Sequence, residues 1–169
     1  MVALELESLT KAWPALRINV DLRIEPGHLV ALAGPSGCGK STILRMIAGL
    51  CAPDSGTIRI DGKDVTALSP KNREVGMVFQ DYALFPHLDV LANVAYGLTI
   101  RRIPRKQREA LSLELLDSVG MRSFGKRRIH ELSGGEKQRI ALARTIAIRP
   151  RIILFDEPVN GLDPEGILW

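Results

Sequence analysis

The chain has 169 residues, which at roughly 100–200 residues per domain corresponds to about one domain. Hydrophobic residues make up 46% and charged residues 25%, so disordered, collagen-like and low-complexity classes are excluded. The net charge of +4 permits an acidic partner without requiring one. No apolar run is long enough to cross a membrane, and acids interrupt the N-terminal stretch that a signal peptide would need. Two cysteines, Cys38 and Cys51, are expected to be free thiols of a reducing compartment.

The first half of the chain reads as strands around a glycine-rich loop. Apolar and polar residues alternate over residues 16–24, which predicts a half-buried strand. Residues 29–33 are all apolar, which predicts a short strand buried on both faces. Glycines follow over residues 34–39, and residues 40–50 then carry apolar side chains at helical spacing. Two more strands are expected, over residues 57–60 and 75–79.

The middle of the chain is predicted to be helical. Asp89 is placed to cap one helix. Pro104 suits the first turn of the next helix, and Gly120 suits its stop. This block interrupts the strands between about Asp81 and Ile148, so we expect an α/β core with a helical insertion.

A third helix and a last strand close the predicted pattern. Ser133 with Glu136 forms a capping box, so a helix should begin there and run to about Ile148. Residues 152–155 are four apolar side chains and predict a buried strand, with Asp156 at its carboxyl end.

The strongest chemical motif is the segment 34–41, Gly-Pro-Ser-Gly-Cys-Gly-Lys-Ser, which fits the phosphate-binding P-loop between a strand and a helix. Glycines let several backbone N–H groups point at one anion, and the helix start adds partial positive charge. Lys40 can reach the β- and γ-phosphates, and Ser41 can bind Mg²⁺.

Two acids follow the predicted strand 152–155. Parallel sheets bind ligands at the carboxyl ends of their strands, so Asp156 and Glu157 are expected at such a site. Asp156 suits the magnesium shell, and Glu157 suits activation of an attacking water.

The segment 132–139, Leu-Ser-Gly-Gly-Glu-Lys-Gln-Arg, is a capped helix start with two glycines, which makes it a second candidate anion site. A plain capped helix is the alternative. One domain has little use for two phosphate cradles, unless one of them serves the nucleotide of a neighbouring subunit.

Together these segments resemble the ATP-binding subunit of ABC transporters over essentially the whole chain. Residues 34–41 resemble that family's Walker A motif, 152–157 its Walker B motif and 132–136 its signature. Gln80 resembles the Q-loop glutamine, and residues 162–163 the end of the D-loop.

The resemblance implies a fold, a cofactor and a set of site residues. The fold class would be α/β, a P-loop NTPase with a RecA-like parallel sheet, an antiparallel β portion and a helical subdomain. Residues 1–84 and 149–169 would form the ATP-binding core, and 85–148 the helical subdomain. ATP and Mg²⁺ would be the cofactors. The expected phosphate-binding residues are Gly34, Pro35, Ser36, Gly37, Cys38, Gly39, Lys40, Ser41 and Thr42.

The remaining roles follow from the same resemblance. Glu157 would polarise water, with Gln80 also catalytic, and Ser41, Gln80 and Asp156 would bind the metal. Ser133, Gly134 and Gly135 would cap the γ-phosphate held by a partner subunit, paired head to tail as a homo- or heterodimer. Trp13 would stack on adenine, although a core or surface tryptophan is the alternative.

The implied function is ATP hydrolysis that drives solute import at the cytoplasmic face of a membrane, together with transmembrane permease subunits. Residues 78–87 look most like importers of polyamines, iron, molybdate or sulfate. No histidine follows residue 157, so the family's switch histidine is absent, and we expect a C-terminally truncated product or fragment.

Two other functions stay open. One is a non-catalytic remnant that only binds nucleotide. The other is a soluble ABC-type ATPase of DNA repair or translation, which the short span from Gln80 to Ser133 and the single cassette disfavour.

The basic clusters and the three histidines are not assigned a function. The basic clusters permit nucleic-acid binding, but no aromatic residues interleave with them, so a solvated face and no nucleic-acid partner are expected. The three histidines lack the spacing of metal ligands. The cluster residues are Arg101, Arg102, Arg105, Lys106 and Arg108, with Lys126, Arg127 and Arg128, and the histidines are His28, His87 and His130.

Overall fold

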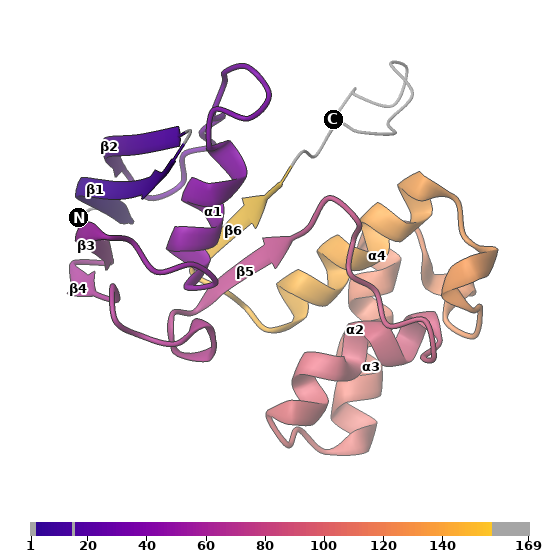
Figure 1. Ribbon diagram of the computed structural model, residues 1–169. Coiled ribbons are helices and arrows are strands. Elements are labelled where there is room, and N and C mark those ends of the chain that lie inside the picture. Colours follow the sequence, from indigo (N-terminus) through magenta and orange to yellow (C-terminus); the bar gives the residue numbers. More distant parts are fainter. Residues whose placement is uncertain (1–2, 15, 157–169) are drawn as a thin grey trace. The chain divides into compact units, whose positions relative to one another are not determined.

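The structure is a computed structural model that describes residues 3–14 and 16–156 (Figure 1). The chain divides into two units, Met1–Val75 and Gly76–Trp169. This division falls earlier than the expected boundary at residue 84, and it groups residues 149–156 with the helices. The predicted membership of residues 149–169 in the ATP-binding core stays a prediction.

The first unit is built on a four-stranded antiparallel sheet in the order β2-β1-β3-β4. Its strands are β1 (Leu4–Trp13), β2 (Leu16–Ile24), β3 (Ser55–Ile60) and β4 (Lys63–Asp64). The predictions of β2 and β3 are confirmed, with β3 beginning two residues earlier than expected.

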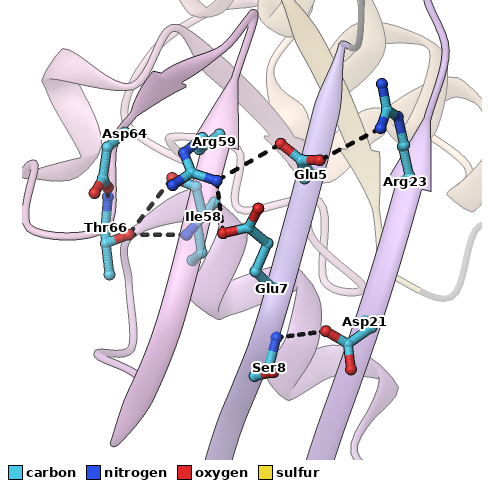
Figure 2. Close-up of polar contacts among 9 residues, drawn as sticks. All are labelled: Glu5, Glu7, Ser8, Asp21, Arg23, Ile58, Arg59, Asp64 and Thr66. Atoms are coloured by element: carbon cyan, nitrogen blue, oxygen red, sulfur yellow. Dashed lines mark hydrogen bonds and ion pairs between the residues drawn. The ribbon is translucent and has the colours of Figure 1, made fainter.

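Strand β1 was not expected, because its alternation of apolar side chains is broken. Leu4 and Leu6 are buried, and the pattern then skips to Leu9, which is fully buried. The break is a bulge at Ser8, whose φ of 46° is left-handed and whose N–H donates to Asp21 Oδ1 at 2.5 Å (Figure 2). The extra residue at a bulge moves all later side chains to the opposite face of the strand. The sequence of β1 therefore lacks the strict apolar–polar alternation by which a strand is recognised.

The polar face of this sheet carries paired charges (Figure 2). Arg59 on β3 lies 2.6 Å from Glu7 and 3.8 Å from Glu5, and Glu5 lies 3.8 Å from Arg23 on β2. The hydrogen bond to Glu7 raises the pKa of Arg59 above its ordinary value. Exposed pairs of this kind contribute little to stability. The residues that alternate with them, Leu4, Leu6 and Ile58, are buried on the opposite face.

The predicted strand over residues 29–33 is wrong. The segment has no strand conformation, and among residues 3–14 and 16–156 no strand pairs with it. Leu29 is 96% exposed and Val30 is 46% exposed. A strand that is apolar on both faces needs neighbours on both edges to satisfy its backbone groups, and the described part of the first unit supplies none.

Helix α1 (Lys40–Ala48) follows the glycine loop and buries its last turn. Gly49 ends it with a left-handed φ of 78°. The buried Arg73, just after the 3-10 turn η1 (Pro70–Asn72), donates to the carbonyl oxygens of Met46 at 2.7 Å and Ile47 at 3.1 Å. This cation satisfies helix-end carbonyls and fixes the end of α1 that lies away from the loop.

Strands β5 (Val75–Val78) and β6 (Ile152–Phe155) form a two-stranded sheet, as predicted, and all but the first residue of β5 belong to the second unit. The two strands run side by side in the same direction (Figure 1). The N–H of Asp156 donates to the carbonyl of Val78 at 3.0 Å, which joins their carboxyl ends. Leu154 is buried, while the other residues of β6 are only partly buried.

Three mutually packed helices form the rest of the described second unit. They enclose one apolar core that contains Val90, Leu116 and Ile140. The Asp89 cap is confirmed, since its side chain accepts from Ala92 N at 2.7 Å. The helices and 3-10 turns are α2 (Val90–Ile100), α3 (Arg105–Ser118), η2 (Arg122–Phe124), η3 (Ile129–Glu131) and α4 (Gly134–Ala147).

The other helix signals are also found. Pro104 lies at the N-cap of α3, one position before the expected first turn. Gly120 follows that helix with a left-handed φ of 68°. Ser133 and Glu136 form the predicted capping box at the start of α4, and Ile148 is the C-cap. Cys38 and Cys51 are free thiols, as expected.

Candidate functional site

The glycine loop before α1 has the backbone that its sequence predicts. Gly37 and Gly39 have left-handed φ angles of 81° and 100°. A Cβ added to Gly39 would lie 2.5 Å from Ile18 Cδ1 on β2, so this position requires glycine for two reasons. Among residues 3–14 and 16–156, no atom lies within 4 Å of a Cβ added to Gly37.

Lys40 lies over this loop. Its ammonium donates to the carbonyl oxygens of Gly34 and Pro35 at 2.8 Å each, and it lies 3.8 Å from Cys38 Sγ. Two neutral carbonyls do not neutralise an ammonium, and an anion at the loop would supply the missing charge.

The first turn of α1 suits a phosphate. It contains no acidic residue, and its N-cap, Gly39, has no side chain with which to fill the helix start. Ser41 and Thr42 follow Lys40 in this turn, where backbone N–H groups point out of the helix. The exposed loop residues, Pro35, Ser36 and Cys38, leave the approach accessible. The residues present therefore fit a nucleotide phosphate.

Trp13 lies at the end of β1, close to the same loop. Its cross-strand partner is Leu16, whose Cδ2 lies 3.7 Å from the Cβ position of Gly39. The indole is 42% exposed, and the Lys11 ammonium lies 5.6 Å from the ring centroid. Asp54 holds Lys11 at 2.6 Å, and this contact lowers the pKa of Asp54. An exposed ring on the hairpin that supports the loop is available for stacking, and its role on adenine stays a prediction.

Gln80 and Asp156 both follow strands of the two-stranded sheet in the second unit. They follow β5 and β6, whose carboxyl ends are joined by the hydrogen bond from Asp156 N to Val78 O. Asp156 is 7% exposed, whereas Gln80 is exposed at a turn closed by the bond from Tyr82 N to Phe79 O at 2.9 Å. A carboxylate and an amide are oxygen donors that suit Mg²⁺, which takes one or two protein carboxylates together with substrate phosphates.

The described side chains also indicate whether Mg²⁺ could bind without a nucleotide. Within the described residues no three His, Cys, Asp or Glu side chains cluster into a metal site of their own. A hydroxyl, an amide and a single carboxylate would instead need phosphate oxygens to complete an octahedral shell. Gln80 and Asp156 belong to the second unit and Ser41 to the first, so their joint binding of a magnesium ion stays a prediction.

The signature segment forms the start of α4. Ser133 Oγ accepts from Glu136 N at 3.3 Å, and Glu136 Oε2 accepts from Ser133 N at 2.7 Å. These hydrogen bonds hold the pKa of Glu136 below its ordinary value. Within the described part of the chain, a Cβ on Gly135 would meet nothing within 4 Å, and one on Gly134 would approach only the Tyr82 hydroxyl, at 3.8 Å. A second molecule can therefore come close to this backbone.

Each unit carries part of the predicted site. Trp13 and the phosphate loop belong to Met1–Val75, whereas Gln80, Asp156 and the signature belong to Gly76–Trp169. Glu157 and the D-loop residues Leu162 and Asp163 lie outside the described residues.

Arg144 was missed by the sequence analysis. From α4 its guanidinium donates to the carbonyl oxygens of Ala83 at 2.7 Å and Tyr82 at 3.0 Å. Burial lowers the pKa of Arg144 below that of a solvated guanidinium, while Asp81 opposes the shift. In the sequence it is one arginine within the helix predicted from Ser133 to about Ile148, and no local pattern distinguishes it.

The basic cluster at the start of α3 is largely exposed, as expected. Arg105 pairs with Glu109 at 2.8 Å, and this contact raises the pKa of Arg105. Arg108 donates to Ile103 O at 3.3 Å. These contacts agree with a solvated helix face.

Comparison with known proteins identifies relatives along most of the chain. The family model described as ABC transporter matches residues 18–160. A sulfate/thiosulfate import ATP-binding protein, CysA of Gloeobacter violaceus, is 49% identical over 160 residues, which cover 94% of this chain and 46% of that protein. An Fe(3+) ions import ATP-binding protein, FbpC of Pasteurella multocida, is 46% identical and covers 95% and 46%. The chain thus spans about half the length of these relatives.

A solved structure shares the fold. It is a dimeric ATP-binding cassette in a post-hydrolysis state with ADP and Pi, 34% identical, with a TM-score of 0.84. The match covers 96% of this chain and 77% of that one, so the P-loop fold with an antiparallel β portion and a parallel sheet is confirmed. No helix in the described part of the chain has the length and apolarity to cross a membrane.

Proposed function

This chain belongs to the ABC transporter family, and from that premise we propose that it binds ATP with Mg²⁺ and hydrolyses it as the ATPase subunit of an importer. The observation that carries the proposal is the glycine loop. Lys40 lies against two loop carbonyls at an uncapped helix start, so an anion is the missing partner. The truncation predicted from the sequence stays a prediction.

Residues of the first unit bind the nucleotide in this proposal. Lys40 exchanges part of its contact with Gly34 and Pro35 for phosphate oxygens. The N–H groups at the start of α1 donate to the same phosphates, and Trp13 offers an exposed ring face to adenine. Adenine recognition rests on stacking, which does not select strongly among bases.

Residues of the second unit act on water and metal. Gln80 and Asp156 would bind Mg²⁺, which when bound neutralises charge on the β- and γ-phosphates, and Ser41 of the first unit is the other expected ligand. Glu157 would orient the attacking water and accept its proton. The buried position of Asp156 supports this assignment, because a carboxylate with little solvent keeps a fixed orientation toward its ligand.

A second subunit completes the site. The glycines at the start of α4 leave their backbone accessible, which suits a phosphate presented by a partner. The similar cassette of known structure is dimeric, and a head-to-tail pair would place each α4 start over the other subunit's nucleotide. Whether the pair is a homo- or heterodimer is set by the other chain.

The transported solute would be a small inorganic ion. The similar proteins are named for sulfate/thiosulfate and Fe(3+) import, and this chain would serve a permease of that kind at the cytoplasmic face of a membrane. Copurification of the tagged chain with membrane permeases supports the proposal. Recovery with ribosomes or DNA supports the soluble ABC-type ATPase of the alternative.

The direct test is Mg²⁺-dependent ATP binding and phosphate release by the purified chain and its Glu157→Gln variant. We expect both proteins to bind ATP and only the unsubstituted chain to release phosphate, because the amide cannot accept a proton from water. Absence of ATP binding by both proteins would overturn the proposal.

One observation favours a second candidate function, nucleotide binding without turnover. The segment that leads into the phosphate loop is exposed at Leu29 and Val30 and is unpaired among the described residues. If the segment that leads into the phosphate loop is not fixed, the loop holds the phosphate less rigidly. A small displacement of the phosphate lowers the rate of hydrolysis more than it lowers the affinity for ATP. Equal binding with no phosphate release by either protein in the same experiment would select this candidate.

A further inference from the structure

The loop that follows Gln80 has an unusual backbone. Tyr82 and Ala83 are consecutive and both left-handed, with φ angles of 63° and 44°. Residues with a Cβ rarely adopt this conformation, and it persists only where the surroundings hold it. Something in the second unit must therefore fix this turn.

Arg144 on α4 is the group that does so. One guanidinium donates to both carbonyls of the left-handed pair, at 3.0 Å to Tyr82 and 2.7 Å to Ala83. It also lies 5.3 Å from the ring centroid of Phe85, which gives a cation–π contact. The planar guanidinium donates to the two carbonyls through two separate nitrogens while it also lies near the ring.

The same turn contains Gln80. The bond from Tyr82 N to Phe79 O closes the turn around Gln80, and Ala83 N donates to Asp81 Oδ1 at 3.2 Å. Tyr82 is thus bonded to the Gln80 turn through its N–H and to Arg144 through its carbonyl.

The far side of the loop is held separately. The buried Asn93 on α2 accepts from Phe85 N at 2.8 Å and donates to Phe85 O at 3.1 Å. The loop is therefore fixed beyond Phe85 without Arg144, and the region that depends on Arg144 is residues 80–84.

Tyr82 also reaches the other end of α4. Its hydroxyl lies 3.8 Å from the position that a Cβ on Gly134 would occupy. The main chain of Tyr82 contacts Arg144 near the end of α4, and its side chain lies beside the signature glycine at the start of that helix. The Gln80 loop and the signature helix are thus joined at two points.

We propose that Arg144 is a positioning residue for Gln80, which fixes the Gln80 turn to the signature helix. The functional part of this inference rests on the proposed magnesium role of Gln80. Loss of Arg144 releases the turn and lets Gln80 leave the metal, while α4 and the rest of the unit keep their fold.

The first test measures amide hydrogen exchange of the full chain. In Arg144→Gln we expect exchange at residues 82–84 to rise at least tenfold, because both carbonyl contacts are lost. Arg144→Lys, which keeps the charge and can reach one carbonyl, should give an intermediate rise. Arg139→Gln is the matched control, since Arg139 is an exposed arginine of the same helix, and it should leave this exchange unchanged.

Global unfolding is monitored in the same experiment. Exchange in β1 and β3 should be the same in all variants, which separates local release from loss of the fold. Unchanged exchange at residues 82–84 in Arg144→Gln, or an equal rise throughout the chain, would overturn the proposal.

The second test compares ATP affinity with Mg²⁺ and with a chelator. Arg144→Gln should weaken ATP binding three- to tenfold with Mg²⁺ and leave it unchanged with the chelator, because only the metal contact is affected. Equal weakening in both conditions would contradict a role through Gln80. If the unsubstituted chain binds no ATP at all, the proposed function fails, and the exchange measurement alone then decides whether Arg144 fixes the loop.

Discussion

Helices α1 and α4 both begin beside glycines, yet their first turns are completed differently. At α1 the cap is Gly39, no acid lies in the first turn, and Lys40 lies over the loop. At α4 the Ser133 hydroxyl and the Glu136 carboxylate already fill the helix start. The first anion site is open, whereas at α4 the chain's own side chains already occupy part of the helix start, although the backbone of the two glycines stays accessible.

From these two helix starts we infer which site binds nucleotide first. An anion at α1 meets an ammonium and free space, whereas one at α4 must tolerate a carboxylate and gains fewer backbone donors. We therefore expect α1 to supply most of the affinity. The start of α4 contributes after a partner subunit presents a phosphate that is already bound.

The largest expected effect is on ATP affinity. Lys40→Ala removes one charge-assisted contact of about 1.5–3 kcal/mol, which should weaken binding by about 10- to 150-fold. Lys137→Ala, in the first turns of α4, is the matched control and should change ATP affinity of the single chain by less than about twofold. Isothermal titration with Mg-ATP measures both. Equal losses of ATP affinity in the two variants would contradict the claim that the start of α1 supplies most of the affinity.

Glycine-to-alanine substitutions at the two helix starts should change the unfolding free energy of the chain differently. Gly39→Ala places a Cβ 2.5 Å from Ile18 Cδ1 at a left-handed φ, so unfolding free energy should fall by about 1–3 kcal/mol. Gly135→Ala enters open space in a helix and should be neutral or stabilising by up to about 1 kcal/mol. Urea denaturation gives both values, and a destabilised Gly135→Ala would contradict the open approach.

The cap of α4 should have a smaller effect. Ser133→Ala leaves Glu136 N without its acceptor, so unfolding free energy should fall by about 0.5–2 kcal/mol. Ser133→Asp restores an acceptor and should recover most of this loss. Thermal denaturation followed by circular dichroism tests the pair, and failure of aspartate to rescue would show that the hydroxyl acts in some other way.

The smallest expected effect depends on pH. The pKa of Glu136 is lowered in the folded chain by its hydrogen bonds to Ser133, so the folded state favours the carboxylate. The stabilisation is fully present above the ordinary value of 4.5 and is lost as pH falls through the folded pKa. Denaturation measured from pH 7 to pH 3 should show that the unfolding free energy of the unsubstituted chain exceeds that of Glu136→Gln at neutral pH. This difference should shrink as the pH falls below 4.5. A constant difference across this range would contradict the assignment.

Local signals predicted the parts of the fold that depend on local chemistry. Asp89, Gly120 and the Ser133 box each act within one helix turn, so their sequence patterns were sufficient. The glycine loop was also predictable, because its backbone is set by residue type.

The features that depend on distant neighbours were not predictable. Residues 29–33 have the composition of a buried strand, but a strand forms only where partners exist, and composition does not report partners. Strand β1 was hidden by the bulge at Ser8, which a contact with Asp21 stabilises from another strand. Arg144 was missed for the same reason, since its carbonyl partners at Tyr82 and Ala83 are remote in sequence.

The most direct test of the account is an amide NMR titration of the full chain with Mg-ATP at low protein concentration, where subunits do not pair. The open start of α1 predicts that signals of residues 37–42 shift first and saturate, while those of residues 133–136 stay in place. Shifts that begin at residues 133–136, or equal shifts at both helix starts, would contradict the claim that α1 is the primary nucleotide site.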